Sequence, residues 1–210
     1  ACELLVPVRT PEWKRPALSS VYALTKYDQE RMCLVYGAAY DVPTVALRFF
    51  NVYGRHQALS NPYTGVLAIF ASRLLNGRPP LVFEDGRQSR DFVHVRDVAN
   101  AVAAALEPGA ADYEALNVAT GDSISVSDVA AALAEALDVA LESEIRNEYR
   151  AGDIRHCFGD ASRAQALLGW TASTTFQDGM RELATWLAGQ AAVDRVDEAA
   201  AALARRGLTG

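Results

Sequence analysis

The sequence contains few cysteines, and none of them are close together. Cys2, Cys33 and Cys157 are widely spaced and form no Cys-x-x-Cys pair. Disulfide frameworks and zinc sites need paired or clustered cysteines, and the histidines His56, His94 and His156 do not have the spacing of metal ligands either. We therefore expect no disulfide framework, no metal site and a cytoplasmic location.

Positive charge and long hydrophobic runs are also scarce. The chain has 20 Lys and Arg residues against 26 Asp and Glu, with a formal net charge of −6. This balance argues against binding to nucleic acid, although a few local arginines could still hold one small anionic ligand. No apolar run approaches the length of a bilayer span, and no signal peptide is visible, so we expect no membrane association.

The amino end lacks an initiator methionine and a clear domain start. Pro7, Pro11 and Pro16 predict an irregular arm over residues 1–17. At 210 residues, half of them apolar, the chain can form one large or two small domains. We expect it to be the later part of a longer protein.

Helical and strand patterns alternate after the arm, which predicts an α/β fold. Residues 18–40 form an uninterrupted helical pattern that ends before Pro43, and residues 44–50 have the β-branched and aromatic composition of a buried parallel strand. Residues 51–63 then predict a loop at the carboxyl end of that strand, where open α/β sheets bind ligands. Further helices are expected at 65–76, 95–106, 126–137, 162–168, 176–189 and 192–206, with strands at 81–83, 115–119 and 141–145.

Tyr22 and Lys26 stand four residues apart in the first expected helix, so they project from one face about one turn apart. A phenol has a pKa of about 10 and is a poor base near neutral pH. A neighbouring ammonium lowers the pKa of a phenol, which suits proton exchange with an alcohol or carbonyl. Such pairs also occur by chance on helices, so the assignment depends on the rest of the chain.

The remaining motifs give the pair a context. They are Leu47-Arg-Phe-Phe-Asn-Val-Tyr-Gly54, Asn61-Pro-Tyr-Thr-Gly-Val66, Gln88-Ser-Arg-Asp-Phe-Val-His-Val95, Asn117-Val-Ala-Thr-Gly121, Arg150-Ala-Gly-Asp153 and Leu167-Leu-Gly-Trp170. In this order and spacing, over about residues 18–189, the chain resembles the carboxyl-terminal part of the extended short-chain dehydrogenase/reductase family. More closely, it is similar to the NAD-dependent nucleotide-sugar epimerases and dehydratases.

The resemblance implies the later part of a Rossmann-type doubly wound fold plus a smaller α/β substrate-binding domain, with the amino-terminal dinucleotide-binding half absent. The expected divisions are an arm (1–17), a remnant of the dinucleotide-binding domain (18–54), a mainly substrate-binding region with return segments to the Rossmann part (55–189) and an Ala-rich helical tail (190–210). The family's glycine-rich turn for the dinucleotide pyrophosphate and its catalytic Ser or Thr both lie outside this chain. Ser19 and Ser20 are too close to Tyr22 to be that residue and are expected to cap its helix.

The same resemblance assigns roles to residues. Tyr22 is implied to be the catalytic acid and base, and Lys26 to assist it, with both residues contacting the NAD cofactor. The nucleotide-diphospho-sugar, a dTDP- or UDP-sugar, is implied to contact Asn51, Gly65, Val66, Phe83, Arg90, Arg150 and Asp153, with Arg155 as an additional candidate. Arg90 and Arg150 would grip the diphosphate, because a guanidinium binds phosphate oxygens in bidentate fashion.

Alternatives remain open from the sequence. Asn51 could simply form a turn, Phe83 could belong to the core, and the arginines could be ordinary surface residues. Within the family, the Pro7–Glu12 lead-in resembles that of enzymes for dTDP-6-deoxysugars such as dTDP-L-rhamnose, but a 4,6-dehydratase or a decarboxylase is the runner-up to an epimerase. The chain could also be a truncated, non-catalytic fragment that binds a nucleotide sugar or forms a dimer. A homodimer through the Tyr22 helix is expected, since the family commonly uses that helix in dimers.

Overall fold

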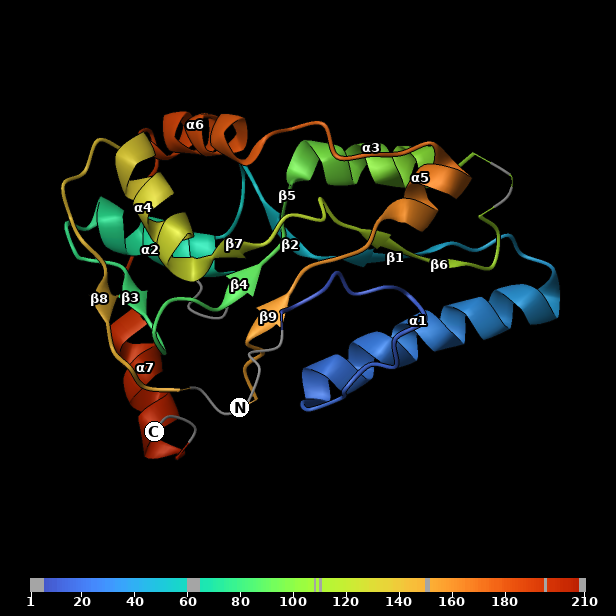
Figure 1. The fold of residues 1–210 in the computed structure, drawn as a ribbon, viewed down its shortest axis with the longest axis horizontal. Coiled ribbons are helices and arrows are strands. Elements are labelled where there is room, and N and C mark those ends of the chain that lie inside the picture. The colour runs from blue at the N-terminus through green and yellow to red at the C-terminus, as the bar shows by residue number, and fades with distance from the viewer. Residues whose placement is uncertain are drawn as a thin grey trace.

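The computed structural model describes residues 6–59, 65–107, 109, 111–149, 152–194 and 196–207, which form an α/β fold (Figure 1). The helices are α1 Val21–Tyr40, α2 Val66–Leu75, α3 Val95–Ala105, α4 Val126–Ala136, α5 Ser162–Leu168, α6 Phe176–Leu187 and α7 Val196–Arg205. The strands are β1 Ala46–Phe49, β2 Asn51–Tyr53, β3 Leu81–Val82, β4 Ser89–Arg90, β5 Phe92–His94, β6 Ala115–Val118, β7 Ile124–Ser125, β8 Glu144–Ile145 and β9 His156–Cys157. The predicted α/β class is confirmed. Within this described part, no helix is both long enough and apolar enough to cross a bilayer.

One continuous run of chain changes its pairing partner at Phe50. Before that residue, β1 pairs in parallel with β6, Ala46 lying opposite Ala115. After it, β2 pairs in parallel with β5, which begins at Phe92. In Figure 1, the β1–β6 pair lies between α1 on one side and α3 with α5 on the other, whereas α2, α4 and α6 gather at the other end of the molecule.

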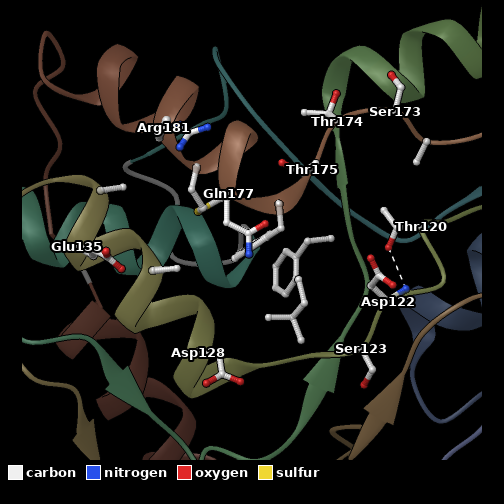
Figure 2. Close-up of a pocket in the computed structure, with 17 residues that line it drawn as sticks. Thr120, Asp122, Ser123, Asp128, Glu135, Ser173, Thr174, Thr175, Gln177 and Arg181 are labelled. Carbon is white, nitrogen blue, oxygen red and sulfur yellow. Dashed lines mark hydrogen bonds between the residues drawn. The ribbon is translucent and has the colours of Figure 1, made fainter.

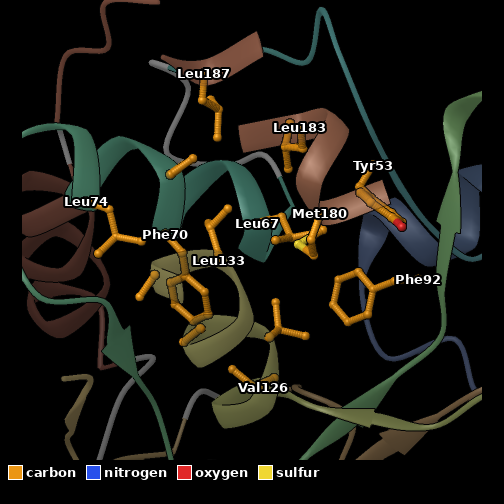
Figure 3. Packing of buried hydrophobic residues seen from close by; sticks show 14 of the residues in the cluster. Tyr53, Leu67, Phe70, Leu74, Phe92, Val126, Leu133, Met180, Leu183 and Leu187 are labelled. Atoms are coloured by element: carbon orange, nitrogen blue, oxygen red, sulfur yellow. The ribbon is translucent and has the colours of Figure 1, made fainter. Parts of the chain in front are cut away.

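The larger hydrophobic cluster fills the space between α2, α4 and α6, and Figure 3 shows its side chains pointing toward one another. Phe70, Leu133 and Leu183 are almost completely buried there, one from each helix. Burying such a side chain contributes about 1.5–3 kcal/mol. Tyr53 of β2 and Phe92 of β5 extend the cluster toward the sheet.

A second cluster lies around the β1–β6 pair. Its buried members are Val93, Val98, Ala101, Ala111, Leu116, Val118, Ala164 and Trp170, from β5, α3, β6, α5 and adjoining loops. The indole Nε1 of Trp170 donates a hydrogen bond of 2.9 Å to the carbonyl oxygen of Asp97. Segments late in the chain, such as α5 and Trp170, therefore pack against the β1–β6 pair. The domain boundaries given above stay a prediction.

Two local expectations were wrong. The strand over 44–50 was expected to be buried, but Phe49 is 49% exposed and the other residues of β1 are half-buried, because among the described residues only β6 pairs with β1. The segment 51–63 was expected to be a loop, but its first three residues form β2. Their Asn-containing sequence suggests a turn, and the pairing with β5, which is remote in sequence, overrides that preference. Residues 60–63 of the expected loop lie outside the described residues.

Helix α1 has apolar side chains on two sides. Ser20 caps its amino end, as predicted, by accepting a 3.1 Å hydrogen bond from the backbone N–H of Ala23. Leu34 and Gly37 are its buried residues. The side away from them carries exposed Val21, Met32, Val35 and Tyr36, which we call the outer stripe of α1.

An ion-pair network attaches the carboxyl-terminal helix α7. Arg73 of α2 has a side chain only 6% exposed, and its Nη1 lies 2.8 Å from Oδ1 of Asp197 and 3.7 Å from Oδ2 of Asp194. Arg78 also pairs with both carboxylates. The expected helical tail is thus confirmed for Val196–Arg205, and ion pairs from Arg73 and Arg78 to Asp197 hold it.

The carboxylate of Asp91 joins the segments around the change of strand partner. It is completely buried and accepts hydrogen bonds from the N–H and Oγ1 of Thr120 (2.9 and 2.7 Å) and from the N–H groups of Gly121 (2.9 Å) and Gly159 (3.1 Å). Those donors follow β6 and β9. A buried carboxylate is tolerated only when its oxygens are satisfied in this way.

Removing the Asp91 carboxylate should strongly destabilise the fold. Asp91→Ala leaves several buried donors without an acceptor, at about 1–3 kcal/mol each, so we expect a loss of at least about 3 kcal/mol in the free energy of unfolding. Asp91→Asn keeps the shape and one carbonyl oxygen and should lose roughly half as much. Urea unfolding measures both variants. The control is Glu142→Gln at an exposed site, which should stay within about 0.5 kcal/mol of wild type. Wild-type stability in Asp91→Ala would contradict the role given to this carboxylate.

Candidate active site

Tyr22 and Lys26 lie on the same side of α1, one turn apart, and both are exposed. The Nζ of Lys26 is 5.8 Å from the centroid of the Tyr22 ring and donates a 3.4 Å hydrogen bond to Oε1 of Gln29. Tyr22 is 71% exposed. The hydroxyl and the ammonium are thus both available at the first turns of α1.

Arg90 and Asp153, 63 residues apart in sequence, form an ion pair in which Nη2 lies 3.0 Å from Oδ1. The Nη1 of Arg90 also donates to the carbonyl oxygens of Ser89 (2.9 Å) and Arg155 (3.2 Å). With its side chain only 15% exposed, Arg90 is held in one orientation by β4 and by the segment before β9.

Arg155 is engaged by the turn between β3 and β4. Its Nη1 lies 2.6 Å from Oε2 of Glu84 and 2.6 Å from Oδ1 of Asp85, and its Nη2 lies 2.8 Å from Oδ2 of Asp85. This hydrogen bonding holds the pKa of the Asp85 carboxyl well below its usual range and raises the pKa of Arg155. The turn begins directly after half-buried Phe83.

The other predicted contacts lie near strand and helix ends. Asn51 is half-buried at the start of β2, and its N–H donates to the carbonyl oxygen of Asp91 at 2.9 Å. Gly65 precedes α2 and is exposed, and an added Cβ there would meet no atom within 4 Å. Val66, half-buried, packs against the larger cluster. Arg150 lies outside the described residues.

The structure brings some of the predicted residues into two groups. Arg90 is hydrogen-bonded to Asp153 and to the backbone of Arg155, and Arg155 bonds the turn that follows Phe83. Tyr22 and Lys26 instead stand on α1. In Figure 1, the amino end of α1 is the end turned toward β9. The arm before α1 is also tied there, because the N–H of Thr10 donates to the carbonyl oxygen of Phe158 at 2.8 Å.

The sequence did not reveal the acidic partners of Arg155 or the hydrogen bonds that connect Ser123, Ser89 and His156. Glu84 and Asp85 precede Gly86 in a segment typical of a turn, and nothing in that local pattern identifies Arg155 as their partner. Ser123 Oγ donates to Ser89 Oγ at 2.7 Å, and Ser89 Oγ lies 2.9 Å from Nδ1 of His156. Nothing in the sequence pattern places these three side chains together.

His94 has a structural role in this fold. Its Nδ1 accepts a hydrogen bond from the N–H of Arg96 and so caps α3, and burial lowers its pKa. Over the part of the chain that the structure describes, no three His, Cys, Asp or Glu side chains are grouped so as to hold a metal ion.

A groove of about 1130 Å³ lies elsewhere, between α4, α6 and the loops after β6 and α5. Figure 2 shows Asp128 and Glu135 on one wall and Gln177 and Arg181 on the other. Its floor includes buried Phe92 and Met180. None of the predicted site residues that the structure describes lines this groove, so its size does not make it the active site.

Comparison with known proteins agrees with the motifs. The model of the "NAD dependent epimerase/dehydratase family" matches residues 8–119. A dTDP-L-rhamnose 4-epimerase from Burkholderia thailandensis is 37% identical over 174 residues, which cover 82% of this chain and 47% of that protein. A UDP-glucose 4-epimerase from Mycolicibacterium smegmatis is 35% identical over 164 residues, covering 77% of this chain and 51% of the relative. The chain thus spans about half the length of these curated relatives.

Solved structures show the same likeness. The UDP-glucose 4-epimerase from Thermotoga maritima with UDP-glucose has a TM-score of 0.79 and 31% identity, covering 89% of this chain and 59% of that one. The Thermus thermophilus UDP-glucose 4-epimerase, in complex with NAD, has a TM-score of 0.71 and 32% identity, covering 87% and 60%. The fold, the ordered motifs and these matches agree, and the chain belongs to the NAD-dependent epimerase/dehydratase family.

Proposed function

We propose that this chain forms the catalytic Tyr/Lys pair and the nucleotide-sugar site of an NAD-dependent 4-epimerase acting on a dTDP- or UDP-sugar. The observation that carries the proposal is the exposed Tyr22–Lys26 pair on one side of α1, within a chain of this family. The 37% identity to a dTDP-L-rhamnose 4-epimerase supports a dTDP-6-deoxysugar as the first substrate to test.

In this proposal, Tyr22 moves the proton. Its phenolate oxygen takes the proton from the sugar hydroxyl as that carbon becomes a carbonyl, and it returns the proton when the carbon is reduced from the other face. The positive charge of Lys26 stabilises the phenolate between these steps. NAD, when bound, supplies the hydride acceptor for the first step and the hydride donor for the second.

The chemistry of the α1 pair fits a dinucleotide. The Lys26 ammonium is bonded to the neutral amide of Gln29, so its charge is available to ribose hydroxyls, and the Tyr22 hydroxyl is exposed beside it. We propose that these two residues contact NAD and that a dinucleotide-binding half outside this chain holds the rest of the cofactor. On this view the present chain alone is inactive.

Arg90 is the best prepared diphosphate ligand among the described residues. Its backbone contacts fix the guanidinium before any ligand arrives, which lowers the entropic cost of binding. Asp153, already bonded to Arg90, is proposed to contact the nucleotide ribose. We also propose the substrate contacts that the family resemblance implies for Asn51, Gly65, Val66, Phe83 and Arg150.

The outer stripe of α1 supports a homodimer as a further part of the proposal. Several exposed apolar side chains on one helix face are typical of an interface. Pairing two copies of α1 would bury this stripe and fix the helix that carries Tyr22. The low cysteine content supports a cytoplasmic location.

Tyr22→Phe should abolish epimerisation by the full-length protein. Without the hydroxyl, proton transfer loses its general acid and base, and we expect kcat to fall at least about 10²-fold. Separation of the two sugar epimers measures this, and Tyr27→Phe is the matched control on α1. A product lighter by one water would instead identify a 4,6-dehydratase. Unchanged kcat in Tyr22→Phe would refute the assigned role.

Arg90→Met should weaken binding of the nucleotide diphosphate. It keeps the stem of the side chain and removes the charge, so we expect KM for the nucleotide sugar to rise about 10–100-fold, as for a charge-assisted hydrogen bond worth about 1.5–3 kcal/mol. Steady-state kinetics measure this change. Arg87→Met, at an exposed position between β3 and β4, is the control and should leave KM unchanged. Equal effects of both substitutions would contradict a specific contact.

Val35→Glu should convert a dimer to monomers, because two charges would be buried against apolar partners. Sedimentation of the full-length protein at several concentrations measures the association. Val102→Glu, at an exposed apolar position on α3, should leave it unchanged. A dimer that persists in Val35→Glu would exclude the outer stripe as its interface.

A further inference from the structure

The charge around Arg155 differs from that expected of a diphosphate ligand. Its guanidinium is shared between Glu84 and Asp85 through three short contacts. Together, one cation and two carboxylates carry a net charge of −1. A diphosphate would have to displace both carboxylates to reach the guanidinium and would meet their repulsion.

The same contacts join two segments that are distant in sequence. Arg155 directly precedes β9, and its carbonyl oxygen accepts a hydrogen bond of 3.0 Å from the N–H of Ser89 in β4. Glu84 and Asp85 form the turn that leaves β3. The backbone of Arg155 is therefore fixed by β4 while its side chain holds the turn.

The turn starts at Phe83 and has little freedom of its own. The carbonyl oxygen of Phe83 accepts a 2.9 Å hydrogen bond from Nε2 of Gln88. Glu84 has a left-handed backbone, with φ of 50°, a conformation that costs energy for a residue other than glycine. The ion pairs that Arg155 forms with Glu84 and Asp85 offset this conformational cost at Glu84.

We propose that Arg155 is a positioning residue, which with Glu84 and Asp85 forms a latch that sets Phe83 against the nucleobase of the nucleotide sugar. This inference rests on the proposed function, and in it Arg155 touches neither phosphate. It replaces a direct ligand role for Arg155 with a role in base recognition. Arg90 remains the residue that contacts the diphosphate.

Calorimetric titration of the full-length protein with UDP and UMP, and in parallel with dTDP and dTMP, separates the two roles. If Arg155 positions Phe83, Arg155→Met weakens the binding of the diphosphate and of the monophosphate by the same factor, about tenfold. Arg90→Met is the contrast, because it should weaken diphosphate binding more than monophosphate binding. Steady-state kinetics of Arg155→Met should show a raised KM with kcat within twofold of wild type.

Substituting the two carboxylates should change nucleotide affinity in opposite directions for the two possible roles of Arg155. Glu84→Gln/Asp85→Asn breaks the latch and should weaken nucleotide binding about as much as Arg155→Met does. If Arg155 were a phosphate ligand, the same double substitution would free it and tighten UDP binding. Phe83→Ala should weaken binding by itself, and adding Arg155→Met to it should cause no further loss, because both act on one contact.

Three outcomes would overturn the latch. They are tighter diphosphate binding in Glu84→Gln/Asp85→Asn, a loss confined to the diphosphate in Arg155→Met, and full additivity of Phe83→Ala with Arg155→Met. If the wild-type protein binds none of the four nucleotides, the proposed function fails and the latch fails with it. Thermal unfolding of each variant is measured alongside, and a melting temperature near that of wild type excludes general misfolding as the cause of a loss.

Discussion

The buried carboxylate of Asp91 is the contact on which the rest of the structure depends. It stands where the strand partner changes from β6 to β5, and it accepts four hydrogen bonds from residues that follow β6 and β9. These segments are brought together there by polar contacts with the buried carboxylate. A carboxylate can satisfy several backbone N–H groups at once, which no apolar side chain can do.

The residues of the proposed site come from two separate parts of the fold. Arg90, the proposed diphosphate ligand, lies on β4, next in sequence to Asp91, and its ion pair with Asp153 links β4 to the segment before β9. Tyr22 and Lys26 instead lie on α1, which packs beside β1. In the proposed reaction, a sugar bound at Arg90 and oxidised beside Tyr22 would need both parts of the fold in a fixed relation.

Much of this could be predicted from the sequence, where local chemistry decides the structure. Ser20 was expected to cap the helix of Tyr22, and its Oγ accepts the hydrogen bond from the N–H of Ala23. The helices were predicted because helix-forming residues run without proline between capping, glycine and proline signals. Strands β4, β7 and β9 were not predicted, because each has only two residues, which is too short for an alternating pattern. They form by pairing with partners that are remote in sequence. The site residues came from the family resemblance, whereas the engagement of Arg155 by Glu84 and Asp85 depends on a turn whose geometry no local pattern reveals.

Helix α1 carries the proposed catalytic pair yet has few buried residues, Leu34 and Gly37. The bidentate ion pair of its Glu30 with Arg48 also ties α1 to β1. If two copies pair through the outer stripe, as proposed, the second copy would complete the packing of the helix that carries Tyr22. The rate of proton transfer at Tyr22 would then depend on the concentration of the protein itself.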